Sequence, residues 1–104
     1  MQKATEGFDP VTASADGPLL VKFSAPWCGP CKALGPVLEA AATELSLPVF
    51  EVDIEALPDL TGKYRVRGVP TTMLFMNGKV MGSMVGAGDR EKVLRFIDES
   101  LSLV

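Results

Sequence analysis

Histidine is absent from the 104-residue chain, and cysteine occurs only twice. A structural zinc site usually has four Cys or His ligands, so this chain cannot complete one alone, and we expect no metal. Only a metal cluster whose ligands come from two chains would be compatible with so few Cys and His residues. Basic residues are also in the minority, with ten Lys and Arg against thirteen Asp and Glu and a net charge of −3. This balance disfavours nonspecific binding to nucleic acid or to an anionic membrane surface.

Long apolar runs are missing as well. No stretch approaches the length needed to span a membrane, and the polar residues 1–7 show no secretory signal. No repeat, low-complexity segment or linker divides the sequence, so we expect one domain over residues 1–104. These absences predict a cytoplasmic protein in a reducing compartment, where a lone cysteine pair is more often catalytic than structural.

Strand-like and helix-like segments alternate along the chain. Short apolar runs bounded by turn residues predict strands, and apolar spacings of three and four predict helices. Strands are predicted at 19–23, 49–53, 71–76 and 79–85, and helices at 31–45 (with Pro36 inside), 57–64 and after the N-cap Asp89. Asn77-Gly78 predicts a tight hairpin. The buried face of the last helix is predicted at Val93, Ile97, Leu101 and Val104, with Phe96 beside it.

This order predicts an α/β fold. Alternating β and α units favour parallel pairing in the first part, and the closing hairpin adds two antiparallel strands. We therefore expect a mixed central sheet with helices on both faces.

Both cysteines fall in the motif Trp-Cys-Gly-Pro-Cys-Lys at residues 27–32. Two thiols separated by two residues can close a short disulfide, reopen and pass two electrons to a partner. Two unrelated buried cysteines would not explain the Gly29-Pro30 pair between them. The motif therefore predicts thiol–disulfide exchange.

A second motif, Arg-Gly-Val-Pro-Thr at residues 67–71, places Pro70 forty-two positions after Cys28. With this motif, residues 75–78 and 85–87, and Pro36 inside the helix, the sequence resembles the thioredoxin family over nearly its whole length. The resemblance implies a thioredoxin fold with four main strands and a vestigial first strand. It also implies a cis-proline at Pro70 facing the disulfide.

Cys28 is expected just before the long helix, where free backbone N–H groups and the helix dipole favour a thiolate. We expect Cys28 to be the nucleophile and Cys31, one turn further in, to be the resolving thiol. By the resemblance, Gly29 and Pro30 tune the redox poise toward a reductant. The expected activity is that of a general protein-disulfide reductant without a bound cofactor, recharged by a separate thioredoxin reductase, most simply an NADPH-linked flavoprotein.

Substrate is expected to dock around Pro70. A cis X-Pro bond exposes the backbone of Val69 to a neighbouring extended chain, and Thr71 completes this segment. An apolar docking surface beside the nucleophile is predicted from Trp27, Val69, Val85, Gly86 and Ala87.

The sequence departs from the family at one charged pair. The family usually has a buried aspartate six residues before the first cysteine and a lysine on the neighbouring strand, whereas this chain has Lys22 and Glu51 at the matching positions. Glu51 is a candidate proton acceptor for Cys31, directly or through water, with Lys22 tuning the thiol pKa by its charge. Two alternatives stay open: the site has no internal base, or Lys22 only extends to solvent.

The start of the chain departs too, because polar residues 1–7 stand where the family has an apolar strand. Loss of that strand would expose residues 49–53 as a sheet edge, so we expect a monomer with a weak tendency to dimerise through this edge. Two rival functions also stay open. One is an oxidant or isomerase of a secretory compartment, and the other is a binding module in which redox chemistry is dispensable.

Overall fold

The computed structural model describes residues 1–102, so the prediction for Val104 lies outside the described residues. Its elements follow the predicted order. They are β1 (Gln2–Lys3), α1 (Pro10–Ala13), β2 (Leu19–Ser24), α2 (Gly29–Glu44), β3 (Val49–Asp53), α3 (Pro58–Lys63), β4 (Thr71–Met76), β5 (Lys79–Val85) and α4 (Arg90–Leu101). No helix within residues 1–102 is long and apolar enough to cross a membrane.

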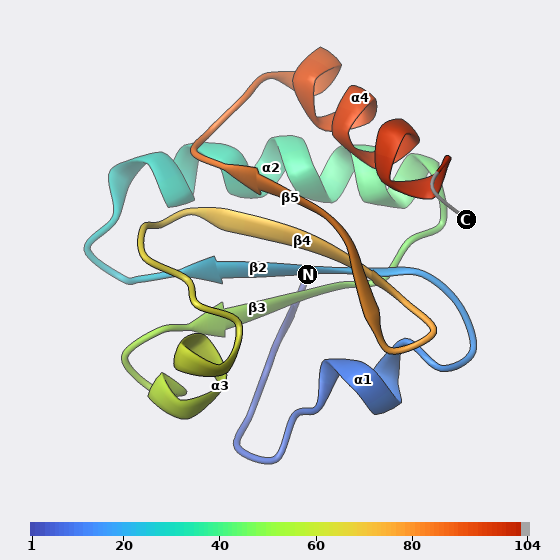
Figure 1. The fold of residues 1–104 in the computed structure, drawn as a ribbon. Coiled ribbons are helices and arrows are strands. Elements are labelled where there is room, and N and C mark those ends of the chain that lie inside the picture. Colours follow the sequence, from blue (N-terminus) through green and yellow to red (C-terminus); the bar gives the residue numbers. More distant parts are fainter. Residues whose placement is uncertain (103–104) are drawn as a thin grey trace.

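The five strands form one mixed sheet in the order β1-β3-β2-β4-β5 (Figure 1). β3 runs parallel to both β1 and β2, whereas β4 is antiparallel to β2 and to β5. Asn77 and Gly78 have positive φ angles of 51° and 80°, which is the conformation that a tight hairpin needs. The predicted mixed sheet and its closing hairpin are therefore confirmed.

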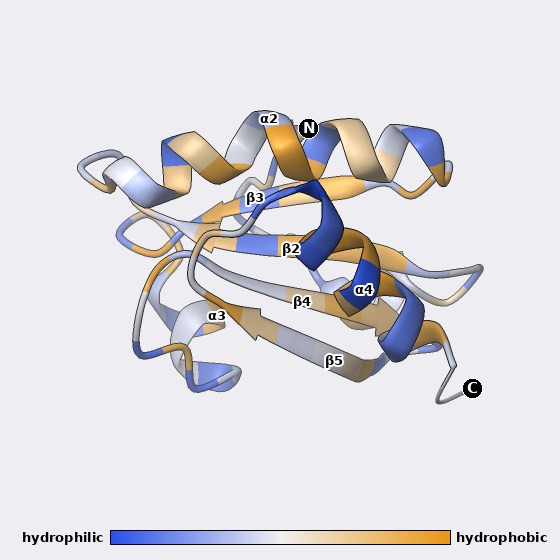
Figure 2. Ribbon diagram, turned by 90° about the horizontal axis from the view of Figure 1, so that it is seen from above, coloured by the Kyte–Doolittle hydropathy of each residue, from blue (hydrophilic) through white to orange (hydrophobic). Residues whose placement is uncertain are grey.

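Helices cover both faces of this sheet, as predicted. α2 and α4 lie on one face, and α1 and α3 lie on the other (Figure 1). Viewed from the α2 side, the central strands carry much of the apolar colour and α4 is largely polar (Figure 2). The core on the α2 side contains Leu20, Leu34, Leu38, Leu74, Val93 and Ile97 among others, with Phe96 and Leu101 packed against it.

The opposite core layer includes an aromatic contact between Tyr64, the residue that caps the C-terminus of α3, and Phe75 of β4. The ring of Tyr64 meets that of Phe75 edge-on, with centroids 5.1 Å apart. Burial, with a smaller contribution from the negative charge of Asp9, raises the pKa of Tyr64 above 10.0.

The first strand is as short as expected, but it does not leave β3 at the edge of the sheet. Gln2 pairs with Phe50 and Lys3 with Glu51, and the Ala4 N–H donates to the Glu51 carbonyl at 2.8 Å. The expectation of an exposed edge is therefore wrong for Phe50 and Glu51, because backbone hydrogen bonding in a parallel pair does not require apolar side chains. β1 and β5 are the outer strands of the sheet.

Candidate active site

The cysteine motif lies where β2 gives way to α2. Cys28 is the N-cap of α2, with extended backbone angles (φ −90°, ψ 107°), and Pro30 lies in the first turn. The helix begins at Gly29, two residues earlier than predicted. Pro suits this position because its missing N–H is one that the helix start could not bond anyway.

Cys28 and Cys31 are joined by a disulfide whose Cα atoms are 5.3 Å apart. The Cys31 N–H donates to the Cys28 sulfur at 3.2 Å, so a backbone N–H of the helix start already points at this atom. Such a donor stabilises negative charge on the Cys28 sulfur once the disulfide opens. Cys28 and Cys31 are 4% and 2% exposed.

The segment at Pro70 faces this disulfide. The Val69–Pro70 bond is cis, and the Val69 carbonyl oxygen lies 3.8 Å from the Cys28 sulfur. The Pro70 carbonyl accepts a hydrogen bond from the Gly86 N–H at 2.8 Å, which draws the end of β5 to the same place. The Thr71 side chain turns inward instead: it is 4% exposed, and its hydroxyl donates to the Gly68 carbonyl at 2.7 Å.

Two large apolar side chains stand out around the disulfide. Trp27 is 66% exposed and Val85 is 68% exposed. The indole N–H of Trp27 donates to a Glu55 carboxylate oxygen at 3.1 Å, which orients the ring. Gly86 and Ala87 directly follow Val85, the last residue of β5, and the hydrogen bond of the Gly86 N–H to the Pro70 carbonyl brings this segment next to Pro70.

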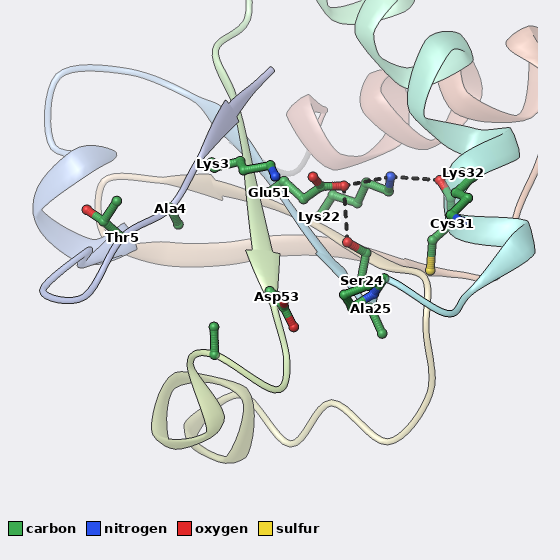
Figure 3. Close-up of a pocket in the computed structure, with 12 residues that line it drawn as sticks. Lys3, Ala4, Thr5, Lys22, Ser24, Ala25, Cys31, Lys32, Glu51 and Asp53 are labelled. Atoms are coloured by element: carbon green, nitrogen blue, oxygen red, sulfur yellow. Dashed lines mark hydrogen bonds and ion pairs between the residues drawn. The ribbon is translucent and has the colours of Figure 1, made fainter.

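Lys22 and Glu51 are direct neighbours on β2 and β3. The Lys22 ammonium lies 3.1 Å from a Glu51 carboxylate oxygen and donates to the Cys31 carbonyl at 2.7 Å (Figure 3). The Lys22 side chain is only 2% exposed, so the alternative in which it extends to solvent is wrong. The Glu51 side chain is 27% exposed. A buried cation therefore lies between the Glu51 carboxylate and the backbone carbonyl of Cys31.

A cavity of about 440 Å³ opens beside this pair. Its lining includes Glu51, Lys22 and Cys31, together with Lys3 and Thr5 from the N-terminal segment. The sequence did not reveal this cavity, because it depends on the path of the segment that pairs with β3. No group of three or more Cys, Asp or Glu side chains within residues 1–102 is placed to hold a metal ion.

The sequence also missed Ser24, whose hydroxyl donates to the same Glu51 oxygen that Lys22 contacts, at 3.1 Å. A signal for it existed. Ser24 follows Lys22 by two positions on a strand, and residues two apart in a strand share a face.

A disulfide between cysteines three positions apart at a helix start, with an exposed aromatic ring and the Val69 carbonyl of a cis Val69–Pro70 bond beside it, defines a thiol–disulfide oxidoreductase. A family model described as Thioredoxin matches residues 1–99. The chain belongs to the thioredoxin family.

Individual relatives agree with this assignment. Thioredoxin of Pseudomonas aeruginosa is 41% identical over 96 residues, which cover 90% of this chain and 89% of that protein. Thioredoxin C-2 of Corynebacterium nephridii is 38% identical over 98 residues, with 92% and 91% covered. Thioredoxin of Rhodospirillum rubrum is 37% identical over 102 residues, with 96% and 98% covered. The chain is a protein-disulfide reductase of the thioredoxin type, and its family implies disulfide-containing substrates and a reductase.

Proposed function

We propose that the protein reduces protein disulfides in general, with Cys28 as nucleophile and Cys31 as resolving thiol. The Cys28 thiolate attacks one sulfur of the substrate disulfide, the substrate S–S bond breaks, and the other substrate sulfur leaves as a thiolate. Cys31 then attacks the Cys28 sulfur, so the Cys28–Cys31 bond forms and the second substrate sulfur is released. The hydrogen bond from the Cys31 N–H to the Cys28 sulfur carries this assignment.

The docking surface supports a substrate held as an extended chain. Within residues 1–102, neither the N–H nor the carbonyl of Val69 makes a backbone–backbone hydrogen bond. The Val69 N–H is thus available to a substrate backbone, and the Val69 carbonyl, whose contact is the Cys28 sulfur at 3.8 Å, lies where the substrate disulfide would react. Trp27 and Val85 offer exposed apolar side chains for further contact. Pro70 and Thr71 contribute by shaping this segment, since the Pro70 side chain is buried and the Thr71 hydroxyl is bonded internally.

Glu51 is the proposed acceptor of the proton that Cys31 loses during resolution. The Oε2 atom of Glu51 contacts the Lys22 ammonium, and the same ammonium donates a hydrogen bond to the Cys31 carbonyl. Because Glu51 and Cys31 line the same cavity, water in that cavity supplies the path. Lys22 adds a positive charge close to the dithiol and so favours its thiolate forms. Gly29 and Pro30, in the first turn of α2, set the redox poise.

The partners follow from this cycle. The electron donor is a thioredoxin reductase in the cytoplasm, and the protein acts as a single-domain monomer that needs no bound cofactor. Pairing of β1 along β3 supports the monomer, because it occupies part of the edge through which a second chain would add. Sedimentation at micromolar and millimolar concentration tests this, and a dimer at both would contradict it.

The reductase activity is tested by the turbidity that develops when insulin is reduced in the presence of dithiothreitol. We expect the wild-type protein to accelerate precipitation and Cys28→Ser to abolish the acceleration. A Cys28→Ser variant as active as wild type would overturn the nucleophile assignment. Equilibration with glutathione separates a reductant from an oxidant, since an oxidant would hold its reduced form more tightly.

A further inference from the structure

Ser24 lies at the end of β2, on the same face of the sheet as Lys22, and is 6% exposed. Its hydroxyl donates to Glu51 at 3.1 Å, although its direct neighbour on β3 is Asp53 (Figure 3). The contact is therefore diagonal across the two strands. Long side chains such as that of Glu51 can reach diagonal neighbours, but they do so in only some of their rotamers.

The two donors converge on one atom. Lys22 and Ser24 both contact Oε2 of Glu51, each at 3.1 Å, and no hydrogen bond from residues 1–102 ends on Oε1. An ammonium group is a point charge that does not fix the plane of a carboxylate. A second donor from a different direction restricts that plane, so Oε2 stays engaged and Oε1 stays available.

The available oxygen belongs to the side chain that lines the cavity next to Cys31. We propose that Ser24 is a positioning residue for the resolution step: it holds Glu51 so that Oε1 receives the Cys31 proton. This rests on the proposed role of Glu51 as acceptor.

In the step itself, the Cys31 S–H bond breaks and its proton passes through cavity water to Oε1. The Cys31 sulfur forms its bond to the Cys28 sulfur, and the bond from Cys28 to the substrate sulfur breaks. The electron pair of that bond leaves with the substrate as a thiolate.

Single-turnover kinetics test the inference, because attack and resolution are separate phases. Formation and decay of the mixed disulfide are followed by acid quench and mass analysis, between pH 5 and 8. We expect Ser24→Ala to slow decay by about tenfold, as for the loss of one hydrogen bond to a charged group, while formation changes less than about twofold. In Ser24→Thr, which keeps the hydroxyl, the mixed disulfide should decay at the wild-type rate. Ser83→Ala, an exposed serine of β5, is the matched control and leaves both phases unchanged.

The double variant Ser24→Ala/Glu51→Gln separates the possible failures. If Ser24 acts through Glu51, Ser24→Ala adds no further slowing once Glu51→Gln is present. Wild-type decay in Glu51→Gln would overturn the acceptor role of Glu51 itself. Two outcomes would overturn the inference about Ser24 alone. In one, the mixed disulfide decays slowly in Glu51→Gln but at the wild-type rate in Ser24→Ala. In the other, the effects of the two substitutions on the decay rate are fully additive. Urea unfolding of each variant checks that the fold is kept.

Discussion

Removing one member of the Lys22–Glu51 pair is expected to have very different consequences depending on which member is removed. The Lys22 side chain is 2% exposed and has its countercharge at 3.1 Å, whereas the Glu51 side chain is 27% exposed. Glu51→Gln leaves a buried ammonium without a countercharge. Lys22→Met leaves a carboxylate that borders a cavity and keeps the Ser24 hydroxyl as a donor. The first change should therefore cost more stability than the second.

The magnitudes follow from what each variant leaves behind. Glu51→Gln should lower the free energy of unfolding by about 3 kcal/mol, the lower end for breaking a buried pair, since Gln keeps an acceptor oxygen. Lys22→Met should lower it by about 1 kcal/mol, mainly because the Cys31 carbonyl loses its hydrogen bond. The double variant should lie within about 1 kcal/mol of wild type, because a buried pair replaced as a unit leaves no isolated charge.

Urea unfolding of the oxidised proteins at pH 7, followed by circular dichroism, measures these differences. The unfolding slope should stay constant across the series, so that the midpoints report stability alone. A greater loss for Lys22→Met than for Glu51→Gln would refute the reasoning. So would a double variant less stable than Glu51→Gln, because the buried ammonium would then be stabilising even without its countercharge.

Three further outcomes are expected. Burial raises the pKa of Tyr64, so the folded state favours the neutral phenol more than the unfolded state does. The free energy of unfolding should therefore fall as the pH rises from 10 through the pKa of Tyr64 in the folded state. Tyr64→Phe should remove this decline, and an identical decline in the variant would contradict the assignment. Thr72 has a fully buried hydroxyl without a hydrogen-bond partner in the described chain, so Thr72→Val should raise the free energy of unfolding by about 1 kcal/mol. A lower free energy of unfolding for Thr72→Val, measured with urea, would contradict this, because the hydroxyl would then have a hydrogen-bond partner. A Cβ at Gly82 would overlap the buried Ser100 side chain, so Gly82→Ala should cost about 1–3 kcal/mol. In the matched control Gly88→Ala the new atom meets only the flexible Lys92 side chain, and equal losses in both variants would contradict this reasoning.

The sequence predicted the fold well where local patterns and tertiary packing agree. The apolar run at residues 19–23 became the central strand β2, and Asn77-Gly78 became the hairpin turn with positive φ angles. Each of these signals has one dominant physical cause, namely burial on both faces or tolerance of a left-handed backbone. The cysteine pair and Pro70 were informative for the same reason, since each motif fixes a backbone geometry.

Features that depend on backbone pairing or on diagonal contacts were not predictable. Gln2 and Lys3 carry no apolar pattern, yet their backbone covers part of β3. The contact of Ser24 with Glu51 depends on the rotamer of a long side chain. The inward orientation of Thr71 follows from a hydrogen bond within its own turn, which the motif alone did not distinguish from substrate contact.

Trapping of the mixed disulfide tests the central claim that Cys28 attacks and Cys31 resolves. Cys28→Ser and Cys31→Ser are each incubated with an excess of a disulfide-containing peptide at pH 7, and the intact masses are then measured. We predict that Cys31→Ser accumulates an adduct of the protein with half of the peptide disulfide and that Cys28→Ser stays unmodified. An adduct that accumulates faster on Cys28→Ser than on Cys31→Ser would contradict the account.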